Sequence, residues 1–316
     1  MIVVAEITDG ILISKARPSL VFRYARLSLV EARPTVQIVF LLRYALGTAF
    51  TSRQHGPNPE QLVVGALAWW LAVVAAYLIN GVMDVKEDRA NGSVRPIARG
   101  DLPERTAAFL TAGATAGSLL LSQFVPGLTI WTAAFLLLGW IYSAPPFPAK
   151  RWSSACAVVV FGLGWTSFAG GAATAGGGLD TAGLVFATVM SAWMALVGSV
   201  VKDLSDVDGD ATGGRRTVAV RHGAWLARAL GAAGALAVGT GGVLAALRWA
   251  PLTLAAMVPV AVGAVCVVAQ IVRTARIEGA DKHTRRSAYR AFMRTQYTAN
   301  LVMVAALVLH ATTTMR

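Results

Sequence analysis

The feature that most constrains this chain is LVVGALAWWLAVVAAYLI, residues 62–79, a run of 18 residues without a charged side chain. A helix of about 20 mostly apolar residues spans the hydrocarbon core of a bilayer. In the whole chain 56% of residues are hydrophobic and 14% are charged. A soluble domain carries about 25% charged residues, so the sequence predicts a membrane protein.

Apolar segments of similar length recur along the whole chain. The breaks between them hold turn-forming sequences such as RQHGPNP, VPG and APPFPAK. None of these breaks is long enough for a second soluble domain, so we predict one domain over residues 1–316. We expect an all-α, polytopic fold with nine transmembrane helices at 34–52, 61–83, 106–123, 127–145, 153–174, 181–201, 224–246, 250–272 and 291–311.

The basic residues are distributed unevenly between the predicted loops. Of 28 Lys and Arg residues, 24 lie before the first segment or in the loops after segments two, four, six and eight. Three lie in the other loops or at the C-terminus. Basic loops stay in the cytoplasm, which places the N-terminus and the loops after segments two and six there. The net charge of +12 thus reflects topology, and we expect the lipid bilayer and not nucleic acid as partner.

Residues 1–33 hold no spanning segment. The stretch SLVFRYARLSLVEARP alternates apolar and basic residues at near-helical spacing. This pattern favours an interfacial helix on the cytoplasmic face. A frayed tail is the alternative.

Nine of the sixteen acidic residues fall in two short segments. The first follows the second apolar segment, and the second follows the sixth. Asp84 and Asp206 are 122 residues apart, and so are Asp88 and Asp210, which hints at two similar halves. Spacings of three and four place residues on one helix face, so we expect two stacked sets: Asn80, Asp84 and Asp88, and Asp203, Asp206 and Asp210.

Stacked carboxylates repel one another and are compensated by a divalent cation. Carboxylate and amide oxygens without nearby His or Cys suit Mg²⁺, which binds one or two carboxylates together with substrate phosphates. Basic neighbours would contact the remaining phosphate oxygens. The two segments therefore predict a site for a lipid diphosphate, with Arg95, Arg99, Lys202, Arg215 and Arg216 as the diphosphate ligands.

These segments resemble the motifs of the UbiA-type intramembrane prenyltransferases. NGVMDVKED at 80–88 is similar to the family's NDxxDxxxD motif, and DLSDVDGD at 203–210 is similar to its second Asp-rich motif. RPIARG, YSAPPF and GRRTVAVRHG add to the resemblance, which covers about residues 33–300. Gly81 departs from the usual Asp.

The resemblance implies helices around a central cavity and Mg²⁺-dependent ionisation of a prenyl diphosphate. The prenyl group then passes to a small aromatic or quinone-type acceptor. By motif match, Asn80, Asp84, Asp88, Asp203, Asp206 and Asp210 carry over as metal and diphosphate ligands. The alternative is a terpene cyclase of the same fold, which needs no acceptor.

An allylic cation needs a water-excluded cavity with aromatic walls. Candidate liners are Tyr77, Tyr142, Trp165, Phe168 and Trp193, and Tyr142 is the strongest candidate because it adjoins the APP break.

Two other features concern residues inside the apolar segments. Arg43 lies in the first segment, where three alternatives stay open: an internal acid, an anionic acceptor, or snorkelling to the surface. Cys156 and Cys266 are interpreted as small core residues.

Overall fold

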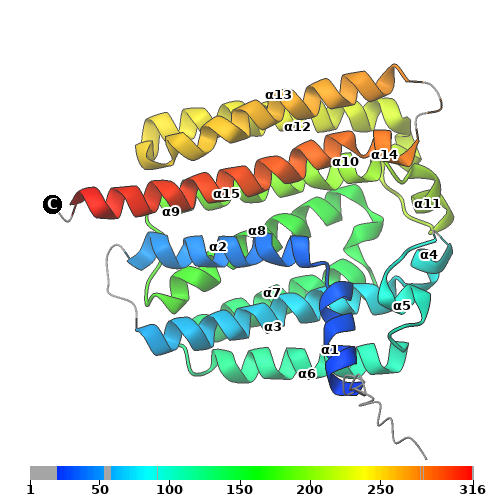
Figure 1. The fold of residues 1–316 in the computed structure, drawn as a ribbon. Coiled ribbons are helices and arrows are strands. Elements are labelled where there is room, and N and C mark those ends of the chain that lie inside the picture. The colour runs from blue at the N-terminus through cyan, green and yellow to red at the C-terminus, as the bar shows by residue number, and fades with distance from the viewer. Residues whose placement is uncertain (1–19, 53–57, 91, 278, 280, 315–316) are drawn as a thin grey trace, which may run out of the picture.

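The computed structural model describes residues 20–52, 58–90, 92–277, 279 and 281–314. All regular secondary structure in this part of the chain is helical (Figure 1). The long helices run side by side as one bundle. They are α2 (Pro34–Ser52), α3 (Pro59–Met83), α6 (Glu104–Ser122), α7 (Leu128–Ser143), α8 (Ser153–Thr174), α9 (Thr181–Ala192), α12 (Val218–Trp249), α13 (Leu254–Ala275) and α15 (Ser287–Thr314).

A helix covers each of the nine apolar ranges predicted from the sequence. Within the described residues, six helical segments are long and apolar enough to cross a membrane. Three helices, α2, α6 and α7, fall outside these criteria, and α7 is an apolar helix of 16 residues. The all-α fold and its membrane character are confirmed, and the count of nine spans stays a prediction.

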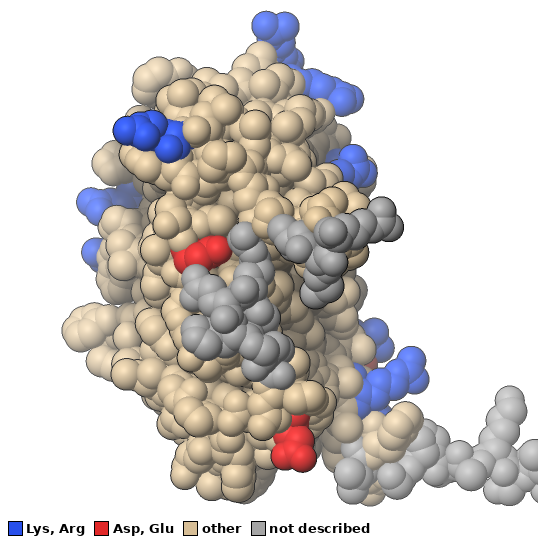
Figure 2. Space-filling view, turned by 90° about the vertical axis from the view of Figure 1, so that its left-hand side faces the viewer, with Lys and Arg blue, Asp and Glu red and all other residues tan. Residues whose placement is uncertain are grey.

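Short helices gather at one end of the bundle, at the right in Figure 1. They are α4 (Val85–Ala90), α5 (Pro96–Arg99), η1 (Ala149–Arg151), α10 (Ser199–Asp203), α11 (Val207–Thr212) and α14 (Lys282–Arg285). The opposite end holds the C-terminus, and most of the surface visible there is neither acidic nor basic (Figure 2). Both acidic segments therefore lie at the same end of the bundle.

The sixth apolar segment is not a uniform α-helix. Between α9 and α10 the chain forms a π-helix, η2 (Trp193–Gly198). π-helical turns are rare and frequently occur at functional sites. Here the π-helix directly precedes α10, which carries the first carboxylate of the second acidic segment.

α1 (Leu20–Glu31) runs across the direction of the long helices, near the end that holds the short helices (Figure 1). Its location at the membrane interface stays a prediction. The part of the predicted interfacial segment before Leu20 lies outside the described residues.

Two apolar clusters hold the bundle together. One joins α2, α8 and α9 to α12, α13 and α15 around the buried rings of Trp193 and Phe186. The other joins α2, α3, α7 and α8 around Trp69 and Phe135. The candidate site lies at one end of this bundle, where the polar side chains of α3, α10 and α11 meet.

Candidate functional site

The first acidic segment begins where α3 ends. Asp84 caps this helix, and its carboxylate accepts a hydrogen bond of 3.0 Å from Asn80 Nδ2. Asn80 Nδ2 also donates to Ser143 Oγ on α7, at 3.1 Å. Lys150 Nζ donates to the other oxygen of Asp84. The side chains of this ion pair are 4% and 8% exposed, so two opposite charges are buried together.

The second acidic segment is broken by a turn. α10 ends at Asp203 and α11 begins at Val207, so the prediction that Asp203, Asp206 and Asp210 line one helix face is wrong. Lys202 Nζ pairs with Asp203 Oδ1 at 3.1 Å. Asp206 instead binds Lys282 Nζ at 2.9 Å and Arg286 Nη2 at 3.1 Å. The turn at 204–206 redirects this carboxylate.

Arg215 connects the two acidic segments. Its Nη2 lies 2.9 Å from Glu87 Oε2 and 3.9 Å from Asp84 Oδ2. Its Nη1 lies 3.3 Å from Asp210 Oδ1. The two acidic segments are 122 residues apart in the sequence, from Asp84 to Asp206, and they meet in space at the guanidinium of Arg215.

Asp88 belongs to a neighbouring group that includes α1. Its Oδ2 pairs with Arg95 Nη1 at 2.7 Å, and Arg95 Nη2 pairs with Glu31 Oε1 at 2.6 Å. Glu31 is fully buried and also accepts a hydrogen bond of 2.9 Å from the backbone N–H of Ile97. A Cβ on Gly81 would collide with Glu31 Oε1. The glycine that replaces the family's usual Asp thus leaves room for a carboxylate from α1.

Two predicted diphosphate ligands lie outside this group of charges. Arg99 pairs with Asp101 at 2.9 Å on the surface, with 58% of its side chain exposed. The side chain of Arg216 is exposed, and its backbone N–H donates to the carbonyl of Arg151. Arg95, Lys202 and Arg215 lie among the carboxylates, so the structure brings together three of the five predicted basic residues.

A cavity of about 140 Å³ begins at the polar residues and continues into the bundle. Asn80 of the first segment and Lys202 beside the second both line it. Its other walls are mainly apolar and come from α2, α3, α7, α8, η2 and α15. The predicted central cavity is therefore present, and its polar residues lie at the end that holds both acidic segments.

Aromatic side chains line this cavity, although not all of the predicted ones. Tyr77 and Tyr142 contribute as predicted. Trp165 packs against Trp131, and Trp193 stacks on Phe292 with ring centroids 6.0 Å apart. Neither they nor Phe168 is among the residues that line the cavity, and the rings missed by the sequence prediction are Phe40, Phe135, Tyr289 and Phe292.

Arg43 is fully buried beside this cavity, which rules out snorkelling. Its Nη2 donates to Gln296 Oε1 at 2.5 Å and to the carbonyl of Met190 at 2.9 Å. Its guanidinium carbon lies 5.7 Å from the centre of the Phe168 ring. No acidic side chain among the described residues forms an ion pair with it, so the internal acid is also excluded.

The two cysteines differ in their surroundings. Cys156 is buried and lines the cavity. Cys266 is exposed, so its interpretation as a core residue is wrong. An apolar run alone does not separate core positions from those that face lipid.

The pKa values of the polar residues reflect a balance between burial and the effect of neighbouring charges. Burial raises the pKa of the Asp210 carboxyl to about 6, against the opposing effect of Lys202 and Arg215. Burial lowers the pKa of Lys150, although Asp84 opposes this shift. Burial would raise the pKa of Asp206, but hydrogen bonds from Lys282 and Arg286 outweigh it, so that pKa lies below its usual value.

The carboxylates suit Mg²⁺ in their chemistry. Among the described residues no three His, Cys, Asp or Glu side chains are grouped as a metal site. However, Asp210 Oδ2 is buried without a hydrogen-bond partner in the described structure, and its other oxygen shares Arg215 with Asp84. A Mg²⁺ ion that also binds substrate phosphates needs only one or two protein carboxylates. These oxygens therefore fit such an ion.

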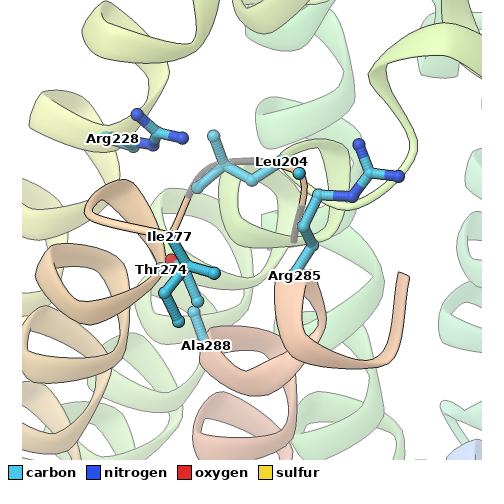
Figure 3. Close-up of a pocket in the computed structure, with 7 residues that line it drawn as sticks. Leu204, Arg228, Thr274, Ile277, Arg285 and Ala288 are labelled. Carbon is cyan, nitrogen blue, oxygen red and sulfur yellow. The ribbon is translucent and has the colours of Figure 1, made fainter. Parts of the chain in front are cut away.

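A second pocket lies beside Leu204, in the turn between α10 and α11 (Figure 3). It has a volume of about 220 Å³ and is lined by Leu204, by Arg228 of α12 and by Arg285 of α14. Neither acidic segment contributes a carboxylate to its lining. The cavity between Asn80 and Lys202 is therefore the better candidate for the functional site.

The sequence prediction gave no role to three residues of the site. Lys150 and Glu87 were counted only within charge patterns, and Glu31 was assigned only to the interfacial helix. The signal for Lys150 was its place after APPFPA, the break that the structure folds back over the end of α3. No local pattern could have placed Glu31, because its partners Arg95 and Ile97 lie 64 or more residues further along the chain.

The fold and these charges define a polytopic helical membrane protein with an ionic site at one end of its bundle. The sequence pattern of the UbiA prenyltransferase family matches residues 40–295, and the chain belongs to this family.

Curated relatives match about half of the chain. A probable homogentisate phytyltransferase 2 of Oryza sativa subsp. japonica is 31% identical in an alignment of 188 residues that covers 52% of this chain and 48% of that protein. A digeranylgeranylglyceryl phosphate synthase of Natronomonas pharaonis is 30% identical over 163 residues, 52% and 57% of the two chains. The chain thus spans about half the length of the curated relatives that it matches.

Solved structures are similar over most of the chain. A UbiA homologue from Archaeoglobus fulgidus bound to GPP and Mg²⁺ has a TM-score of 0.64 at 19% identity, over 89% of this chain and 99% of that one. A structure of digeranylgeranylglyceryl phosphate synthase has a TM-score of 0.65 at 15% identity, over 90% and 99%. At these identities the similarity establishes the fold.

Proposed function

We propose that this protein ionises a prenyl diphosphate with the help of Mg²⁺ and transfers the prenyl group to an aromatic or quinone-type acceptor. The observation that carries the proposal is the position of the charges. Carboxylates and basic side chains of both acidic segments meet at Arg215, and Asn80 and Lys202 line the polar end of a cavity with aromatic walls.

The basic residues bind and stabilise the leaving group. When the carbon–oxygen bond breaks, its electron pair leaves with the diphosphate, whose negative charge increases. Arg215, Lys202 and Lys150 place positive charge at this end of the cavity. Arg95 belongs to the neighbouring group of charges, where it pairs with Asp88. A diphosphate that binds here replaces carboxylates as the partner of these cations.

Asp84, Asp88, Asp203, Asp206 and Asp210, together with Asn80, are the oxygen ligands available for Mg²⁺. When bound, the ion supplies positive charge against the leaving diphosphate. In the structure each of these carboxylates pairs with a Lys or Arg.

The apolar part of the cavity protects the allylic cation. Tyr77, Tyr142 and Phe40 line the walls, and aromatic faces attract a cation. Water would quench the cation, so burial of the reacting carbon is required. The acceptor carbon then forms the new carbon–carbon bond and releases a proton.

The relatives support a transferase. The named relatives include a homogentisate phytyltransferase and digeranylgeranylglyceryl phosphate synthases, so acceptors in this family range from aromatic rings to glycerol phosphates. The relatives support prenyl transfer, and the choice of an aromatic or quinone-type acceptor for this chain is our own proposal.

The test is an assay of purified protein with Mg²⁺ and a panel of prenyl diphosphates, with and without homogentisate and other aromatic acceptors. We expect a prenylated aromatic product from the wild type and from Asp101→Asn, which alters a surface ion pair outside the cluster. Asp84→Asn should lower turnover at least ~100-fold, as expected for loss of a main electrostatic group. A cyclised hydrocarbon formed without acceptor would establish the terpene cyclase instead.

The proposed membrane arrangement has nine spans, with α1 at the cytoplasmic surface and both acidic segments on that side. Single cysteines at Gly92 and Gly213 should react with an impermeant reagent only from the cytoplasmic side, and one at Gly178 only from the other. Labelling of Gly92 and Gly213 from opposite sides would overturn both the topology and the shared site.

A further inference from the structure

The connection from α13 to α15 is rich in arginines that the proposed reaction does not use. Seven Lys and Arg residues lie between residues 273 and 294. Lys282 and Arg286 pair with Asp206. Arg273, Arg290 and Arg294 instead line a groove of about 630 Å³ between α13 and α15, two helices that run side by side in Figure 1.

This groove is separate from the central cavity. Phe292, Met293 and Gln296 on one face of α15 line the cavity, whereas Arg290, Arg294 and Thr298 line the groove. At the floor of the groove α13 and α15 approach closely, since a Cβ on Gly263 would overlap the side chain of Thr295. α15 therefore forms a wall between the two spaces.

The lining of the groove changes in polarity along α13. Arg273 lies at the end of the bundle that holds α14, and Gln270 follows one turn deeper. Cys266 and Val262 lie near the middle of the helix and Pro259 lies beyond it. The 14 residue steps from Arg273 to Pro259 cover roughly 20 Å at the usual helical rise. Charge, then amide, then apolar surface complements the phosphate, the glycerol ester and the acyl chain of a phospholipid, in that order.

The arginines of the groove carry unbalanced charge. Among the described residues no acidic side chain forms an ion pair with Arg273 or Arg294, and Arg290 Nη1 donates to the carbonyl of His283 at 2.7 Å. Both helices are long and apolar enough to cross a membrane, and Val262 is 57% exposed in the groove. Basic pockets between transmembrane helices bind anionic lipid headgroups.

We propose that the α13–α15 groove binds one anionic phospholipid. Arg273, Arg290 and Arg294 bind its phosphate, and one acyl chain lies along Cys266 and Val262. The charge complementarity of the three arginines, which line the same groove as the side chains of Cys266 and Val262, selects this occupant over a soluble anion or a second copy of the chain.

The test measures lipid retention by native mass spectrometry after purification in micelles that contain equal amounts of phosphatidylglycerol and phosphatidylcholine. The variants are R273Q/R294Q and the matched control R221Q/R276Q, which removes two exposed arginines outside the groove. The wild type and the control should retain one phosphatidylglycerol. R273Q/R294Q should retain about 25-fold less phosphatidylglycerol, because each of the two basic residues near an anionic lipid contributes roughly fivefold.

A third variant, C266W, fills the apolar part of the groove and leaves the arginines in place. Cys266 is exposed, so the larger side chain enters the groove and not the core. C266W should also lose the lipid. Wild-type retention in C266W would show that the arginines bind a headgroup or free phosphate alone and would overturn the proposal. Equal retention of phosphatidylcholine, or equal loss in R273Q/R294Q and R221Q/R276Q, would overturn it as well.

Discussion

Lys150 and Asp84 form a buried ion pair at the entrance of the candidate site, and their separate removal tests the energetics of that site. Lys150→Met leaves Asp84 8% exposed with one hydrogen bond from Asn80 and with Arg215 Nη2 at 3.9 Å. Loss of one partner from a buried pair destabilises a protein by about 3–5 kcal/mol. Because Asn80 and Arg215 remain, we expect the lower end, about 3 kcal/mol.

Asp84→Asn leaves the buried ammonium group of Lys150 without its carboxylate partner. We expect a loss of similar size, about 3 kcal/mol. The double variant K150M/D84N removes both charges, and replacement of a whole buried pair is often nearly neutral. It should therefore be more stable than either single variant, with a coupling energy of more than about 3 kcal/mol between the two sites.

The measurement is the free energy of unfolding by SDS titration in mixed micelles, followed by the fluorescence of the chain's nine tryptophans. Prenyl transfer is measured on the same samples. The double variant should regain stability but not activity, since Asp84 is lost. The reasoning is refuted if each single variant loses less than about 1 kcal/mol and the double variant shows their sum.

Further predictions concern the metal, the pH dependence and the glycine beside α1. EDTA should abolish turnover and added Mg²⁺ should restore it, and full turnover in chelated protein would contradict the proposed ionisation. Burial raises the pKa of Asp210 from 3.8 to about 6, so the folded protein holds this proton in that interval while the unfolded chain releases it. Stability should fall as pH rises through this interval, and Asp210→Asn should lack that decline in apparent Tm. Gly81→Asp should destabilise the protein by at least ~2 kcal/mol because its side chain collides with Glu31, and a wild-type Tm in this variant would contradict the packing described here.

The sequence predicted most of the helical framework because apolar length is a local property. Each of the nine apolar ranges is covered by a helix, and the spacing of Asn80 and Asp84 correctly placed the two side chains in contact. The same rule failed at Asp206, where the turn between α10 and α11 points the carboxylate to Lys282. Helical spacing predicts a shared face only while the helix continues.

The partners of the site residues depended on tertiary structure. Arg95 and Arg99 look equivalent in RPIARG, yet Arg95 is bound between Glu31 and Asp88 while Arg99 stays on the surface. The aromatic liners could not be chosen by composition either. Phe40 and Tyr289 line the cavity, whereas Trp165 does not. Which side of a helix faces a cavity is determined by the packing of the helices, and this packing cannot be read from the sequence pattern alone.

The contact between Glu31 and Gly81 also restricts the order in which these two positions can change during evolution. An aspartate at position 81 meets the carboxylate of Glu31, so that substitution is harmful while Glu31 is present. Loss of Glu31 alone leaves Arg95 with Asp88 as its remaining acidic partner among the described residues. Each change is therefore tolerated better after the other, and the two positions should vary together among relatives that keep the arginine. We therefore expect substitutions in α1 and in the first acidic motif to be coupled.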